Sequence, residues 1–319
     1  MAKIQARNVD DALYQRIEMS AMRNERSLEG EIRLALQQYY QPPVVTRSVL
    51  SLRERWQQET GQRLQWLFDR LMEDNFFRES FHAKKAGVPE LIRLSRRLGV
   101  SPGMLMDITE GRHEMTLAQA DTIAGEADAS ADWLLSGTGR PFQVASLGSE
   151  YRDFFLPPGD DCHNAFEFIR IASGRHAGTL ICLRINSRTG DMSLGAVTAE
   201  FMLCNEGCGG TGHGKLLSFL LFLKTQCAHL AMNAFDWGTE EPGFDFWSVV
   251  GQHHPVYFQD FRHRSTAGWL QQVLSGQDPD AWFNGWGNSL VELRDTPFGC
   301  HPEKMPDEVT PAVSGTEAV

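Results

Sequence analysis

The sequence lacks any apolar stretch long enough to cross a bilayer, and its amino terminus lacks the pattern of a secretory signal peptide. The most apolar run, residues 216–223, is too short and is interrupted by Ser218. Cysteine is also scarce, with six scattered over 319 residues, which does not suit a disulfide framework. We therefore expect a cytoplasmic protein with reduced thiols and no membrane partner.

An excess of basic residues is missing too, because the formal net charge is −11. Residues 1–50 carry a net charge of +1, residues 51–145 carry −2, and residues 146–319 carry −10. The acidic C-terminal part would be repelled by nucleic-acid phosphates. Any contact with nucleic acid should therefore come from the first 145 residues and depend on a dimer or a higher assembly.

The first segment, residues 3–9 (KIQARNV), alternates polar and apolar side chains, which is typical of a half-buried strand. A lone strand leaves its backbone hydrogen-bonding groups unpaired, so this segment predicts a homodimer in which two copies pair. Such a ribbon would place Lys3, Gln5 and Arg7 of both chains on one exposed face. The ribbon fits the major groove of double-stranded DNA, and these three residues are the predicted base contacts.

Two short amphipathic helices should follow the strand. Asp10 or Asp11 caps the first, and Asn24 tolerates the left-handed conformation expected at its end. Ser27 caps the second, which ends before Pro42. The second helix carries an apolar stripe formed by Leu28, Ile32, Ala35, Leu36 and Tyr39. The backbone amides of Ser27 and Leu28 are predicted to hold a DNA phosphate.

Residues 1–43 resemble the Arc/MetJ ribbon-helix-helix family, and most closely its FitA-like antitoxin branch. The matching residues are the strand end RNV (7–9) and the run RSLEGEIRLAL (26–36). The resemblance implies an intertwined dimer whose strands read bases and whose second helices clamp the DNA backbone. The alternative from the residues alone is an amphipathic leader that only dimerises the protein.

Residues 44–49 read as a linker, and residues 50–142 as an all-α domain. Helices are expected from about 50 to 74, from 89 to 98, from 102 to near 111, after Thr116 and after Ser130. This region resembles a phage-repressor (Cro/C1-type) helix-turn-helix domain through LIRLSRRLGVS (91–101), ITEGR (108–112) and DWLLSG (132–137). The resemblance implies a second DNA-binding fold.

The helix that would read bases in that fold departs from the expected chemistry. It offers Pro102, Gly103, Met104, Met106 and Asp107, none of which supplies the guanidinium, amide or hydroxyl group that base reading needs. Basic residues nearby are predicted phosphate contacts, namely Arg96, Arg97 and Arg112. The alternative is that this domain mainly packs and oligomerises.

Residues 146–301 are expected to form an acidic α+β domain that senses a ligand or binds a partner, followed by a disordered tail, residues 302–319. Strands are predicted at 165–172, 179–185 and 196–203, and a helix at 215–227. Between the third strand and this helix lies the glycine-rich segment GCGGTGHGK, residues 207–215.

Several interpretations of this segment remain open. A P-loop would need Ser or Thr where Leu216 stands. The segment is similar to the pyrophosphate loop of GNAT acetyltransferases, which implies a phosphate or CoA loop at Gly209, Gly210, Gly212 and Gly214. However, Trp247 replaces the family's tyrosine acid. A plain turn is the third interpretation, and a zinc site at Cys204, Cys208 and His213 is the fourth.

The sequence thus favours a dimeric, sequence-specific DNA-binding transcriptional regulator, a repressor, with a C-terminal domain that binds a ligand or a protein partner. We expect no cofactor, no metal and no catalytic residue. The competing hypothesis is a CoA-dependent acyltransferase that carries autoregulatory DNA-binding modules.

Overall fold

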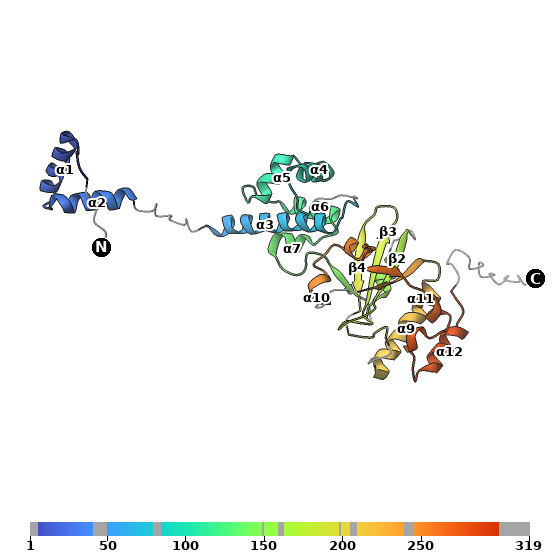
Figure 1. Cartoon of the computed structure of the whole chain (residues 1–319). Helices are drawn as coiled ribbons and strands as arrows, with labels where there is room; N and C mark the ends of the chain where they lie inside the picture. The colour runs from blue at the N-terminus through green and yellow to red at the C-terminus, as the bar shows by residue number, and fades with distance from the viewer. Residues whose placement is uncertain are drawn as a thin grey trace, which may run out of the picture. The chain divides into compact units, whose positions relative to one another are not determined.

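The computed structural model describes residues 6–40, 50–78, 84–148, 150–158, 163–197, 199–204, 209–238 and 245–299. The chain divides into two compact units, Met1–Ser51 and Leu52–Val319, each of which is considered by itself (Figure 1). The expected linker, residues 44–49, and the expected tail, residues 302–319, lie outside the described residues. No described helix is both long enough and apolar enough to cross a membrane.

The first unit contains two helices, α1 (Asp11–Arg23) and α2 (Leu28–Tyr40). The Asp10 carboxylate accepts a hydrogen bond from the Leu13 amide at 3.0 Å, which confirms the predicted cap. The expectation for Asn24 was wrong, because it keeps a negative φ of −98°, and Glu25 takes the left-handed conformation instead. Glu31 of α2 joins the helices by accepting from Ser20 at 2.7 Å.

The second unit begins with five helices whose limits agree closely with the predicted ones. They are α3 (Leu52–Glu73), α4 (Val88–Leu98), α5 (Pro102–Thr109), α6 (Leu117–Glu126) and α7 (Ala131–Ser136). They enclose one apolar core, which includes Leu64, Phe68, Leu105, Ile123 and Leu134. Helix α3 contacts α5 closely, because a Cβ atom added at Gly61 would meet the backbone oxygen of Ile108.

Short local signals fix the ends of these helices. Gly99 ends α4 in a left-handed conformation, and Ser101 begins α5 by accepting from the Met104 amide at 3.2 Å. Thr116 and Gln119 form a capping box at the start of α6. Helices α4 and α5 are therefore joined by a turn of only three residues.

A mixed six-stranded sheet forms the rest of the second unit, in the order β1-β4-β3-β2-β5-β6. The strands are β1 (Val144–Ser146), β2 (Asn164–Ile171), β3 (Leu180–Asn186), β4 (Met192–Ala196), β5 (Ala231–Trp237) and β6 (Arg264–Thr266). Strand β1 runs parallel to β4 and β2 runs parallel to β5, whereas the other neighbouring strands are antiparallel.

The predicted third strand at 196–203 was wrong, because β4 ends at Ala196, where the prediction began. The physical reason is a tight hairpin after β3, in which the Gly190 amide donates to the Asn186 carbonyl at 2.8 Å. The chain re-enters the sheet immediately after this turn, earlier than the apolar pattern had suggested.

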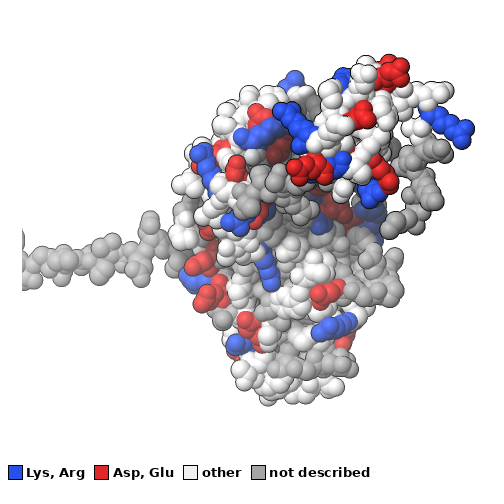
Figure 2. All heavy atoms as spheres, turned by 90° about the vertical axis from the view of Figure 1, so that its left-hand side faces the viewer, with Lys and Arg blue, Asp and Glu red and all other residues white. Residues whose placement is uncertain are grey.

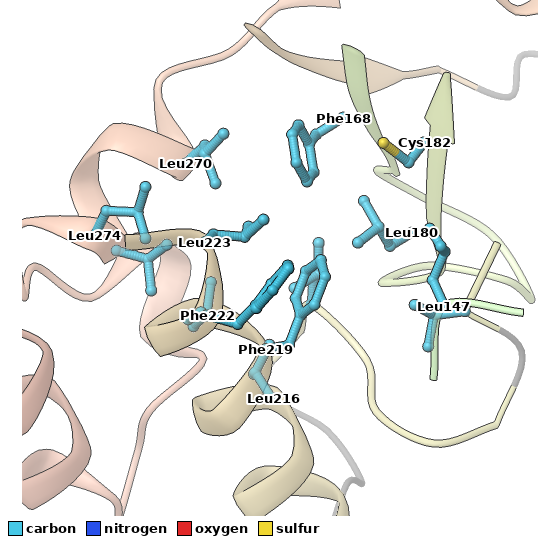
Figure 3. Close-up of a cluster of buried hydrophobic side chains, with 14 of the residues drawn as sticks. Leu147, Phe168, Leu180, Cys182, Leu216, Phe219, Phe222, Leu223, Leu270 and Leu274 are labelled. Carbon is cyan, nitrogen blue, oxygen red and sulfur yellow. The ribbon is translucent and has the colours of Figure 1, made fainter. Parts of the chain in front are cut away.

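Helices cover both faces of the sheet. They are α8 (Arg152–Phe155), α9 (Gly209–Gln226), α10 (Phe246–Val249), α11 (Trp269–Leu274) and α12 (Gly287–Asp295), with short 3-10 turns η1 (Pro255–Gln259) and η2 (Pro279–Ala281). Figure 3 shows Phe219 and Leu223 of α9 and Leu270 of α11 pointing toward Phe168 and Leu180 of the sheet. On the opposite face, Trp237 of β5 packs with Phe246 of α10 and Phe258 of η1.

Two carboxylates, one buried and one half-buried, join the helical part of this unit to the sheet part. Asp74, which follows α3 and has a fully buried side chain, accepts from the His254 amide at 2.7 Å and contacts His253 Nδ1 at 2.6 Å. Asp128, which follows α6, accepts from the Met192 amide at 3.0 Å and lies 3.2 Å from His254 Nε2. These contacts hold the five helices and the sheet together as one compact unit.

Candidate nucleic-acid interface

The segment expected to read bases is only partly described. Lys3 and Gln5 lie outside the described residues, and Arg7 is exposed. Residues 6–10 form no strand within the single chain, and Asn8 has a φ of 59°. A two-stranded ribbon takes its hydrogen bonds from a second copy, so a single chain offers this segment no ladder partner.

The predicted phosphate clamp lies at the start of α2. Ser27 is exposed, and its hydroxyl accepts from the Gly30 amide at 3.1 Å, as a helix-capping residue does. Leu28 is half-buried. The free amides of this first turn and the positive end of the helix dipole favour an anion there.

The first unit exposes most of its apolar side chains. Among its described residues only Ala21 is buried. The side chains of Tyr14, Ile32 and Leu36 are 44%, 40% and 37% exposed. Two helices cannot bury such a surface against each other, so the unit lacks most of a hydrophobic core unless another surface covers it.

In the helical part of the second unit, α5 presents the side chains that were expected to be poor base readers. Pro102, Gly103 and Met104 are exposed, whereas Met106 and Asp107 are half-buried. The Met104 sulfur accepts from Gln119 Nε2 at 3.1 Å. The exposed surface of this short helix is therefore mostly apolar, carries the negative charge of the partly exposed Asp107, and contains no hydrogen-bond donor suited to a base edge.

Two of the three predicted phosphate contacts here are already paired with carboxylates. Arg97 donates to Glu126 at 2.8 Å and lies over the Phe76 ring at 5.1 Å. Arg112 pairs with Glu110. Arg96 is exposed and forms no ion pair with another described residue. A DNA phosphate would thus compete with internal carboxylates for Arg97 and Arg112, but not for Arg96.

Basic and acidic side chains are interspersed on the face drawn in Figure 2, and no broad area there is basic alone. This agrees with the near-neutral charge of residues 1–145. The first 145 residues therefore carry no excess of positive charge that would favour strong nonspecific attraction to DNA.

The glycine-rich segment differs from its predicted form. Gly209, Gly210, Gly212 and Gly214 belong to the first turns of α9, so the expectation of an open loop at these four positions was wrong. The reason is packing, because Leu216 and Phe219 of α9 are buried against the sheet and extend the helix towards its N-terminus. Helical glycines do not wrap around a pyrophosphate as a loop does.

The predicted zinc ligands also have other surroundings. His213 is buried, stacks on Trp286 at a centroid distance of 4.5 Å, and lies 3.3 Å from the Ser289 hydroxyl. Burial lowers the pKa of His213 below its ordinary value. Cys208 lies outside the described residues, and among the described residues no three metal-binding side chains form a cluster with Cys204 or elsewhere.

A charged cluster around Arg170 was not identified from the sequence. Arg170 of β2 pairs with Asp236 of β5 through two hydrogen bonds of 2.8 and 3.0 Å, and with Asp280 at 3.1 Å. Its guanidinium also lies over the Trp282 ring at 4.9 Å. These partners are 66 and 110 residues away in sequence, so no local motif marks the cluster.

Comparison with known proteins covers the N-terminal segment. Residues 2–40 match the family model described as antitoxin FitA-like, ribbon-helix-helix. This match confirms the resemblance seen in the strand end and the second helix, and it indicates a DNA-binding regulator. Neither a curated protein nor a solved structure matches the chain. The phage-repressor and acetyltransferase resemblances receive no support from these comparisons.

Proposed function

We propose that this protein is a dimeric, sequence-specific DNA-binding transcriptional regulator that represses its target genes. The family match over residues 2–40 carries the proposal. Ribbon-helix-helix domains typically bind DNA as dimers, with a strand from each copy in the major groove. Lys3, Gln5 and Arg7 are the proposed base contacts, and the amides of Ser27 and Leu28 the proposed phosphate contacts.

The exposed apolar surface of the first unit supports a homodimer. Leu13, Ile32 and Leu36 each expose more than a third of their surface, although their spacing is that of core residues. Pairing with a second copy would cover them and supply the missing strand partner at once.

The five helices α3–α7 are proposed to form a helix-turn-helix fold that contacts the DNA backbone or assists assembly. The three-residue turn between α4 and α5 and its Gly99 and Ser101 termini support this. The exposed surface of α5 offers no hydrogen-bond donor suited to a base edge, which argues against base reading. The sheet that follows is proposed to bind a ligand or a protein partner, because its acidic sequence disfavours DNA.

Footprinting of the full chain on the DNA upstream of its own gene tests this function. We expect one protected site with two-fold symmetry. The variant Leu36→Asp places a charge in the proposed dimer core and should abolish protection, whereas Arg188→Gln, on an exposed turn of the sheet part, should leave it unchanged. The proposal would be contradicted if the native chain, Leu36→Asp and Arg188→Gln protected the DNA equally. It would also be contradicted if the native chain protected no DNA at all.

A further inference from the structure

A cavity of about 420 Å³ opens where the neighbouring parallel strands β2 and β5 end. Arg170 of β2 and Asp236 of β5 are direct neighbours at this end of the sheet. The cavity is lined by the end of β2 and the turn after it, by residues 202–204 before α9, and by the turn η2. Pockets of this size commonly hold small ligands, and the carboxyl ends of parallel strands are a frequent place for them.

The most buried charged group in the cavity wall is Arg170, whose side chain is only 12% exposed. Asp236 holds one side of the guanidinium through its two hydrogen bonds, and the Trp282 ring covers one face. The Nη1 atom is left for a second anion, and Asp280 fills that place with a single hydrogen bond of 3.1 Å. Arg170 is thus built to hold two carboxylates, one fixed and one weakly held.

The weakly held carboxylate sits on a strained piece of backbone. Asp280 and the next residue, Ala281, both have left-handed conformations, with φ of 51° and 58°. Aspartate enters this region more readily than most residues, but alanine rarely does, and consecutive examples are unusual. The Asp280 side chain is nevertheless 73% exposed, so burial of its own surface does not explain the strain. Strain of this kind concentrates at binding sites.

The geometry points to a binding site for a small organic monocarboxylate, whose carboxylate replaces that of Asp280 on Arg170. Displacement of Asp280 would let the η2 turn relax and would keep the charge on Arg170 balanced. The apolar body of the ligand would lie against Trp282, Met202 and Leu203. Arg175, which is exposed at the same cavity, adds a second positive charge that attracts the anion.

The charge balance favours a monoanion over a phosphate. The positive charges of Arg170 and Arg175 are balanced by Asp280 and by Asp236, the ion-pair partner of Arg170, so the site is neutral while Asp280 is in place. A monocarboxylate restores that balance after Asp280 leaves Arg170, whereas a dianion would add a second negative charge close to Asp236. The walls also offer apolar surface that phosphate cannot use.

This inference deepens the proposed ligand-binding role of the sheet part and rests on that proposal, but it does not depend on DNA binding. It is tested on the full chain in the absence of DNA, with 5-fluorotryptophan incorporated and fluorine NMR as the readout. The Trp282 signal is assigned by the variant Trp282→Phe. Benzoate is the probe, with benzyl alcohol and inorganic phosphate as controls for its apolar body and its charge.

We expect benzoate to shift the Trp282 signal saturably, and the two controls to leave it in place. The variant Asp280→Asn removes the competing carboxylate and should bind benzoate about two- to five-fold more tightly, the range expected for a largely exposed ion pair. Arg175→Gln should bind it more weakly by a similar factor. Arg188→Gln, an arginine on the exposed turn between β3 and β4, should bind it as the native chain does.

Three results would overturn the site. They are a Trp282 signal that benzoate does not move, a shift that benzyl alcohol reproduces, and equal benzoate affinity in Asp280→Asn and the native chain. Footprinting of the same Asp280→Asn preparation keeps the two proposals apart, because it reports the DNA-binding function alone.

Discussion

At the scale of single residues, contacts between residues that are close in sequence were predictable. Contacts between residues that only folding brings together were not. The caps at Asp10, Ser101 and Thr116 follow from a polar side chain just before an apolar helical pattern. Arg170 gave no such signal, because its partners come from β5 and η2. The same holds for His213, whose stacking partner Trp286 belongs to another element.

His213 gives a prediction at this scale. Its pKa in the folded protein is lowered by burial, so the unfolded chain takes up a proton more readily than the folded chain. Stability should therefore be lost as the pH falls below about 6.5, the ordinary value for imidazole. The variant His213→Gln cannot take up this proton, because the glutamine side chain does not titrate.

Urea unfolding at several pH values between about 7.5 and about 5.5 checks this point. The native chain should lose more stability over this range than His213→Gln does. Parallel pH profiles for the two proteins would show that His213 does not contribute to the pH dependence.

At the scale of elements, helices were predicted better than strands. Helices α3 to α7 depend on local periodicity and caps, and their limits agree with expectation to within a few residues. Strand β4 depends on its partners β3 and β1, and apolar residues after Ala196 were mistaken for its continuation. Leu203 belongs to the core without belonging to a strand, so burial alone could not separate the two.

The contact between α3 and α5 is specific enough to test with one methyl group. In Gly61→Ala the new Cβ would meet the carbonyl oxygens of Ile108 and Thr109, and should cost about 1–3 kcal/mol of unfolding free energy. Gly103→Ala is the matched control, because nothing lies within 4 Å of its Cβ position. That change should stabilise α5 by roughly 0.5–1 kcal/mol. If denaturant unfolding gave the same change in unfolding free energy for Gly61→Ala and Gly103→Ala, α3 and α5 would not be packed this closely.

The proposed contact between the five helices α3–α7 and DNA makes a separate prediction about α4. Arg96 is exposed and has no ion pair with another described residue, so it is the arginine of this region best placed to hold a phosphate. Arg96→Gln should weaken DNA binding evenly across sequences and reduce the salt dependence by about one phosphate contact. Binding isotherms over a salt series, with Arg188→Gln as control, measure this slope. An unchanged slope would assign the five helices to packing or assembly.

At the scale of the whole molecule, charge and exposed apolar surface separate the roles of the parts. The N-terminal unit has a family match, near-neutral charge and an uncovered apolar surface, as a dimerising DNA-binding module requires. The residues after 146 carry a net charge of −10, which keeps that part unsuited to DNA. The sequence could not reveal the cavity beside Arg170, because three distant segments build it.

The central claim is that the N-terminal ribbon reads the DNA sequence, and selection of binding sites from random DNA tests it most directly. The full native chain and Arg188→Gln should enrich the same two-fold symmetric motif. Arg7→Ala should lose preference at one position in each half-site and bind the native motif more weakly by about 1–3 kcal/mol. The account would be contradicted if Arg7→Ala, Lys3→Ala and Gln5→Ala all enriched the same motif as the native chain and bound it with the same affinity.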